Sequence, residues 1–165
     1  DQAHSIGKIL HLKKKDILVV DIDEWEGKKW TPRKDITFVH YDKMKNIKSN
    51  SVDFINVRHV LHHINQKEHV KIIKTFDRIL TKNGFIVISE HNIGDVTGSM
   101  VDLVHLLFDV VVSQETSYKN FCDSYFANYH PQKYWVDLFS KKFKLHEVTD
   151  AKTVDATVVL YFKRK

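Results

Sequence analysis

The sequence predicts an α/β fold, in which a mostly parallel sheet has helices on both faces and an antiparallel hairpin at its C-terminal end. Short apolar runs rich in β-branched residues alternate with stretches of helical periodicity, a pattern typical of buried parallel strands joined by helices. The last two extended segments follow each other closely, which favours antiparallel pairing. The 165 residues show no linker-like segment, so we expect a single domain over residues 1–165.

Each element follows from a local pattern. Four apolar runs predict the parallel strands, at Asp16–Ile22, Ile36–His40, Ser51–Val57 and Phe85–Ser89. Apolar residues at helical spacing predict a helix from about Asn65 to Leu80, and Gly84 is expected to end it in the left-handed conformation of a C-terminal cap. Two further helical stretches and the hairpin complete the chain, at Val101–Val112, Lys133–Ser140, Phe143–Val148 and Thr157–Lys163.

Composition excludes several classes of protein. Hydrophobic residues make up 42% and charged residues 28%, which excludes a disordered or collagen-like chain. No apolar run is long enough for a membrane span and no signal peptide is visible, so we expect a soluble, cytoplasmic protein without a membrane partner. The single cysteine, Cys122, can form neither an internal disulfide nor a cysteine-based zinc site. A net charge of +5 favours polyanionic partners without identifying one.

Polar side chains follow the predicted strands at their carboxyl ends, where open α/β sheets bind ligands. A carboxylate at the end of the first strand can accept the hydrogen bonds of a ribose diol, and one after the second can accept from an adenine amino group. The residues at these four strand ends are Asp21, Tyr41 and Asp42, Arg58 and His59, and Glu90 and His91. They predict a nucleoside site along one rim of the sheet.

At this point the sequence resembles the class I S-adenosylmethionine-dependent methyltransferases, which have a Rossmann-like fold. Four pieces in the family's order carry the resemblance, namely Val19–Asp23, Phe38–Asp42, Asn50–Ile64 with its "S-V-D-F-I" and "V-L-H-H-I", and Leu80–Glu90. The resemblance implies S-adenosylmethionine as cofactor. It also implies that Asp21 and the adjacent Ile22 bind the ribose, that Tyr41 and Asp42 bind the adenine, and that the methionine side lies against Asn56, Val57, Arg58 and His59.

The chain departs from this family at its beginning. Members start with a strand and a glycine-rich turn in the middle of the sheet, and neither is present before Asp16. Residues 1–10 are expected to form the helix that follows this turn. A missing central strand leaves unpaired backbone groups that each cost roughly 1 to 3 kcal/mol when buried. We therefore expect that the chain is a fragment, that a longer polypeptide or a partner subunit supplies the strand, or that the sheet closes around the gap.

The part that follows the core is loosely similar to cap methyltransferase domains of large-DNA-virus mRNA capping enzymes. This likeness implies a viral, RNA-binding enzyme that methylates N7 of the cap guanine of a capped 5′ end, by positioning it in line with the sulfonium and without a catalytic side chain. Glu90 would then hold the guanine edge and Tyr129 would stack on it, with His91 and His105 nearby. A methyltransferase for small molecules, and a catalytically silent module that binds RNA or protein, remain as alternatives. The small-molecule reading is favoured if the basic residues do not line the rim.

Two histidine groups allow more than one interpretation. The group His59, His62 and His63 suggests a metal site, because His59 and His63 are four residues apart and could share one helical face. Zinc needs a third and a fourth ligand and none is visible nearby, so packing or capping is the preferred reading and no metal is predicted. His105 shares a helical stripe with Asp102 and Asp109 that could reach a substrate. The alternative is a hydrated stripe on a helix that packs inward through Leu103, Leu106, Leu107 and Val110.

Overall fold

The computed structural model describes residues 2–22, 36–93, 95–114, 116–150 and 156–165. These residues form two compact units, 1–48 and 49–165, where the sequence predicted no boundary. Each unit has its own sheet and is described by itself. No helix among the described residues combines the length and the apolar character that crossing a membrane requires.

The N-terminal unit holds a two-stranded parallel sheet. It begins with helix α1 (Gln2–Ile9), as expected for the segment before the first predicted strand. Strand β1 (Leu18–Asp21) pairs in parallel with β2 (Thr37–His40), and a 3₁₀ helix (Tyr41–Asn46) follows β2 directly. Both predicted strands are confirmed, each shorter than its apolar run. The segment between them lies almost wholly outside the described residues.

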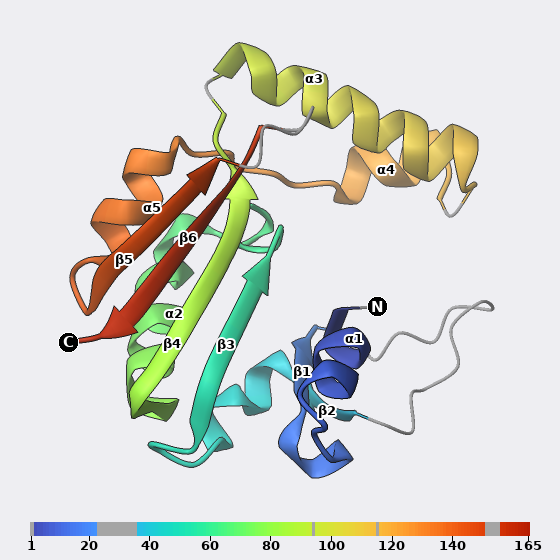
Figure 1. Cartoon of the computed structure of the whole chain (residues 1–165). Coiled ribbons are helices and arrows are strands. Elements are labelled where there is room, and N and C mark those ends of the chain that lie inside the picture. The colour runs from blue at the N-terminus through green and yellow to red at the C-terminus, as the bar shows by residue number, and fades with distance from the viewer. Residues whose placement is uncertain (1, 23–35, 94, 115, 151–155) are drawn as a thin grey trace. The chain divides into compact units, whose positions relative to one another are not determined.

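The C-terminal unit is built on a four-stranded mixed sheet (Figure 1). Its strands are β3 (Val52–Arg58), β4 (Leu80–His91), β5 (Phe143–Asp150) and β6 (Thr157–Arg164), in the order β3-β4-β6-β5. Strands β3 and β4 are parallel, whereas β6 runs antiparallel to both β4 and β5. The predicted C-terminal hairpin is confirmed, although the connection over 151–155 lies outside the described residues.

Helices α2 (Gln66–Ile79) and α5 (Gln132–Phe139) lie on one face of this sheet (Figure 1). Buried side chains alternate along β4, because every second residue faces these helices. The core joins the two layers through Ile72, Ile73, Phe76, Leu80, Ile86, Ile88, Trp135, Phe139, Leu160 and Phe162. Burial of these apolar side chains supplies the main stabilising free energy of the unit.

Beyond the carboxyl end of β4 the chain forms a helical region (Figure 1). Helix α3 (Asp95–Leu106) continues as a π-helical turn (Leu107–Val112), and the short α4 (Tyr118–Ser124) follows. The predicted helix over Val101–Val112 is therefore confirmed and begins earlier than the apolar pattern indicated. The aromatic segment over residues 125–130 then returns the chain to α5.

The predicted role of Gly84 is wrong. Helix α2 ends at Ile79, Leu80 is already extended, and β4 runs through Gly84, whose φ is not in the left-handed region. A Cβ atom at Gly84 would lie 2.7 Å from Cγ of Leu80 and 3.1 Å from the backbone oxygen of Asp53. The glycine is therefore required by the close approach of β3 and the Leu80 side chain, at an irregularity in the β3–β4 register.

The strands divide where the sequence lacks the family's first strand. Among the described residues β1 pairs with β2 alone, and β3 is the edge strand of a separate sheet. The three expectations about the missing strand stay predictions.

Candidate functional site

In the N-terminal unit, the predicted nucleoside-binding residues lie at one edge of the sheet. Asp21 is the last residue of β1 and pairs in register with His40, the last residue of β2, so Tyr41 and Asp42 follow at the same edge. Oδ1 of Asp21 accepts a hydrogen bond from the backbone N–H of the exposed Ile22 (2.7 Å). The Asp42 side chain is 80% exposed. These two carboxylates are acceptors of the kind that ribose hydroxyls and an adenine amino group require.

In the C-terminal unit, the residues predicted to bind a ligand at the end of β3 differ in their exposure. Asn56 and Arg58 are exposed, whereas the Val57 side chain is buried in the core and offers a ligand only its backbone. His59 has a φ of 46°, in the left-handed region that a residue with a Cβ adopts only at a cost. Its backbone N–H donates to the oxygen of Ser89 on β4 (2.8 Å). The strained residue thus begins the turn that follows β3.

Glu90 fixes this turn from the neighbouring strand. Its side chain is completely buried, and Oε1 accepts hydrogen bonds from the backbone N–H groups of Val60 (3.0 Å) and Leu61 (2.7 Å). The second oxygen, Oε2, lies 2.6 Å from Nδ1 of His62, which is also buried. With both oxygens occupied and no exposed surface, Glu90 has no edge to offer a guanine in this structure. We assign it the task of positioning the turn and His62.

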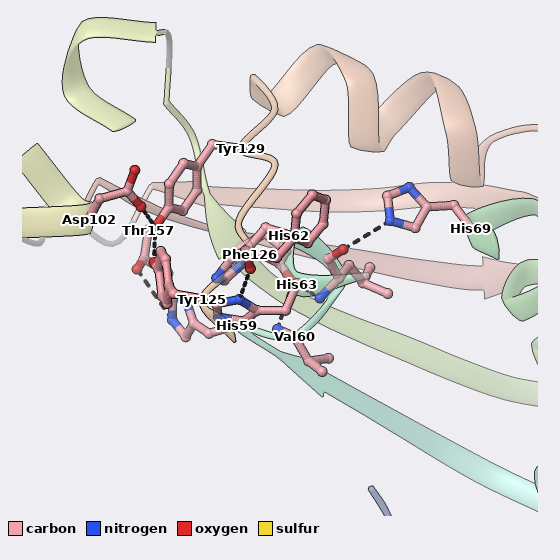
Figure 2. Close-up of polar contacts among 12 residues, drawn as sticks. His59, Val60, His62, His63, His69, Asp102, Tyr125, Phe126, Tyr129 and Thr157 are labelled. Atoms are coloured by element: carbon pink, nitrogen blue, oxygen red, sulfur yellow. Dashed lines mark hydrogen bonds and ion pairs between the residues drawn. The ribbon is translucent and has the colours of Figure 1, made fainter. Parts of the chain in front are cut away.

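His62 is enclosed by other rings (Figure 2). Its ring centroid lies 4.1 Å from that of His63, 5.0 Å from that of His91, and 5.1 Å from that of Tyr129, whose ring is nearly parallel to it. Nε2, the ring nitrogen that does not face Glu90, is buried without a hydrogen-bond partner among the described residues. Buried polar atoms nearly always have a partner, so this nitrogen marks a place where a ligand or water is expected.

A second layer of polar groups connects this turn with α3 (Figure 2). The Tyr129 hydroxyl donates to Oδ1 of Asp102 (3.0 Å) and lies 2.9 Å from the Tyr125 hydroxyl. Gly98 of α3 lies so close to the Tyr129 ring that a Cβ there would be 3.1 Å from it. His105, one turn after Asp102, lies beside the Tyr125 ring. The stripe of Asp102 and His105 therefore faces the aromatic segment.

The alternative interpretation of this stripe expected the apolar residues of α3 to pack inward. Leu103 is 53% exposed and Leu107 is 47% exposed, so the inward packing predicted for them is wrong. The physical reason is that Asp102 needs a hydrogen-bond partner. The aromatic segment supplies one, whereas a purely apolar contact would not. The reading in which the polar stripe is directed toward a site agrees with this geometry.

Burial shifts the titration of the half-buried groups. It lowers the pKa of both His63 and His105 below the ordinary 6.5, because a charged imidazole loses hydration there. It raises the pKa of Tyr129 to about 12 and also raises the pKa of Tyr125, because each phenolate would lose hydration and lie near Asp102. At neutral pH these side chains are therefore uncharged hydrogen-bonding groups.

Sequence reasoning missed two residues that support this arrangement. His69 of α2 is buried, and its Nε2 lies 2.9 Å from the backbone oxygen of Leu61, so it holds the same turn from the other side. Tyr125, whose hydroxyl lies 2.9 Å from that of Tyr129, is the second. A histidine among the apolar positions of α2 is the signal that could have revealed the first, because a buried polar ring needs a partner. No group of three or more potential ligands in the described ranges has the arrangement of a metal site.

Four basic residues of the C-terminal unit lie at the other end of its sheet, away from Arg58. Lys82 is near the start of β4, and the β4–β6 and β6–β5 registers bring Lys144, Lys163 and Arg164 to the same end. Near the helical region, Lys119 and Lys133 each form an ion pair on their own helix. Among the described residues joined by the contacts around His62, none is a lysine or an arginine.

Comparison with known proteins was made by sequence family and by structure. The family model described as a methyltransferase domain matches residues 7–88. No curated protein sequence matches the chain significantly. Among solved structures, a protein from Pyrococcus horikoshii has 15% identity and a TM-score of 0.65, with 98% of this chain and 76% of that chain covered.

Two further structures extend the likeness. An S-adenosylmethionine-dependent methyltransferase from Methanosarcina mazei has 17% identity and a TM-score of 0.56, with 94% of this chain and 86% of that one covered. LepI in complex with S-adenosylmethionine has 10% identity and a TM-score of 0.65, with 99% of this chain but 40% of that one covered. The structural likeness establishes the fold, and the family model establishes the type of domain. The chain therefore belongs to the class I methyltransferases that use S-adenosylmethionine.

Proposed function

We propose that this methyltransferase modifies a small, flat organic molecule and not the cap of an RNA. The observation that supports this choice is the character of the groups around His62. They are aromatic rings and hydrogen-bonding side chains, together with the carboxylate of Asp102. A flat molecule can stack on such rings, and a carboxylate can orient it.

The distribution of charge argues in the same direction. A capped RNA presents a triphosphate, and proteins hold such groups with lysine and arginine. Lys82, Lys144, Lys163 and Arg164 lie at the far end of the sheet, and Lys119 and Lys133 form ion pairs on α4 and α5. The exposed Arg58 at the end of β3 lies at the rim, but we assign it to the cofactor and not to a triphosphate. The overall charge of +5 favours RNA, but the positive charges are not clustered at this rim.

S-adenosylmethionine supplies a methyl group on a positively charged sulfur when it is bound. We assign Asp21 to its ribose hydroxyls, with Ile22 beside it, and Tyr41 and Asp42 to its adenine. The donor set fits, because carboxylates at a shared strand edge are strong acceptors for hydroxyl and amino groups. For the methionine part we assign Asn56, Arg58 and His59 by their side chains, and Val57 by its backbone.

The test compares two kinds of methyl acceptor on the same protein. Formation of S-adenosylhomocysteine is measured with a panel of phenols, catechols and hydroxyquinolines, and in parallel with a capped RNA oligonucleotide. We expect turnover with members of the small-molecule panel and none with the RNA. Methylation of the cap guanine, with an RNA affinity that falls steeply as salt rises, would overturn the proposal in favour of the cap reading.

A further inference from the structure

His62 and Glu90 form a buried pair whose geometry has a chemical consequence. The distance of 2.6 Å between Nδ1 and Oε2 is that of a charge-assisted hydrogen bond, in which the imidazole N–H donates to the carboxylate. A neutral imidazole has one N–H, so Nδ1 holds the proton and Nε2 keeps its lone pair. Glu90 thereby sets the tautomer of His62.

The remaining bonds of Glu90 prevent the pair from rearranging. Oε1 accepts from two successive backbone N–H groups, those of Val60 and Leu61, so the carboxylate cannot rotate without leaving buried donors unpaired. The backbone oxygen of His62 in turn accepts from the N–H of Asn128 (2.7 Å). The imidazole is thus held in orientation by a strand on one side and by the aromatic segment on the other.

The orphan Nε2 is the atom that these constraints leave available. It is buried among rings and has no partner in the described chain, although it is a good acceptor. The groups that titrate around it are Glu90 and His91 on β4, His59 and His63 on the turn, and Tyr129 on the aromatic segment. Among these neighbours only Glu90 places a carboxylate against the ring.

We infer that His62 is a general base, positioned by Glu90, and that the methyl acceptor of this enzyme is an O–H or N–H group. This inference rests on the proposed small-molecule function and narrows its substrate class. The lone pair of the acceptor oxygen or nitrogen forms the new bond to the methyl carbon, and the carbon–sulfur bond breaks with its electrons returning to sulfur. The acceptor proton passes to Nε2, which gives an imidazolium beside the Glu90 carboxylate.

Access to Nε2 involves the aromatic segment. Tyr129 is nearly parallel to the His62 ring, and Phe126 accepts a bond from Nδ1 of His63 through its backbone oxygen (2.6 Å). An acceptor donates to Nε2 only when its O–H or N–H lies in the plane of the imidazole ring, because the lone pair of Nε2 lies in that plane. Catalytic hydrogen bonds are often formed only in the substrate complex, so a covered base is compatible with this role.

Glu90→Gln is the decisive variant. The amide oxygen can accept from the N–H groups of Val60 and Leu61, and the amide N–H₂ then faces Nδ1 of His62 and donates to it. The proton of the imidazole must move to Nε2, which destroys the base and leaves the turn in place. His62→Asn is the second variant, because its amide N–H₂ replaces the Nδ1 donor to Glu90 and offers nothing in place of Nε2. His146→Asn on β5, an exposed histidine, is the matched control.

Two measurements test the inference. Nitrogen-15 spectra of the histidine side chains are expected to show the Nδ1–H form of His62 in the wild type and the Nε2–H form in E90Q, without any substrate. With an active phenol or catechol, kcat is expected to fall about 10² to 10⁴-fold in E90Q and H62N, with KM little changed. The two losses should not add in the double variant, and the fall of kcat at low pH should disappear in both single variants.

The outcomes separate this inference from the proposed function. If the tautomer changes in E90Q but the kcat–pH profile of small-molecule methylation does not, the base role of His62 is refuted while the small-molecule function stands. If wild-type His62 holds its proton on Nε2, the inference is refuted before any assay. If the wild type methylates only the unprotonated N7 of capped RNA, the proposed function fails, and the general base fails with it.

Discussion

Removal of the Glu90 carboxylate should destabilise the C-terminal unit strongly. In Glu90→Ala three donors lose their acceptor at once, namely the buried N–H of Leu61, the buried Nδ1–H of His62 and the part-buried N–H of Val60. Each unpaired buried donor costs about 1 to 3 kcal/mol and the part-buried one costs less, so we expect a loss of about 3 kcal/mol. A typical domain has about 5 to 15 kcal/mol of stability, so this variant approaches the limit of folding.

Urea unfolding followed by circular dichroism measures this effect. With a slope of about 2 kcal/mol per molar, a loss of 3 kcal/mol lowers the unfolding midpoint by about 1.5 M. The matched control is Glu68→Ala, which removes an exposed carboxylate paired with Lys71 and should cost less than about 0.5 kcal/mol. A loss below about 1 kcal/mol in Glu90→Ala would show that the turn does not depend on this carboxylate.

Three further predictions concern other residues. Asp21→Asn should weaken S-adenosylhomocysteine binding by about 1 to 3 kcal/mol in calorimetry, through loss of charged hydrogen bonds, and an unchanged affinity would remove Asp21 from the site. Gly84→Ala should lower the free energy of unfolding by about 1 to 3 kcal/mol, because its Cβ would press on Leu80, and an unchanged melting temperature would contradict this. Because burial lowers the pKa of His63 and His105 below 6.5, the folded state binds fewer protons than the unfolded state, and stability should fall as the pH drops through that value. Urea midpoints across this range should become flatter when both are replaced by Gln, and an unchanged slope would assign the pH dependence to other groups.

The strands and the long helix α2 could be predicted because their patterns depend on local burial. The apolar runs around Val19, Phe38 and Ile86 identified β1, β2 and β4, and the helical spacing of Ile72 and Phe76 identified α2. The carboxyl-end rule correctly brought Asp21 and Asp42 to one sheet edge. These inferences need only the periodicity of side chains along each element.

The roles of individual polar residues could not be predicted in the same way. A glutamate after a strand is equally compatible with a ligand contact and with the buried bonds that Glu90 makes, and only the fold brings Val60 and His62 to it. The orientation of α3 was missed because its apolar residues outnumber Asp102 and His105. The side of α3 with Asp102 and His105 faces inward because its partners lie on the aromatic segment. That segment is distant in sequence, so the spacing of residues along the helix cannot reveal the contact.

The bonds of Glu90 also constrain the length of the chain between β3 and α2. Its three donors come from consecutive residues, Val60, Leu61 and His62, so an added or deleted residue at this point would shift at least one donor out of reach. Loop grafting in this enzyme should therefore be attempted elsewhere, for example within the exposed part of the π-helical turn Leu107–Val112. The number of residues in the turn after β3 is therefore fixed as strictly as the identity of its side chains.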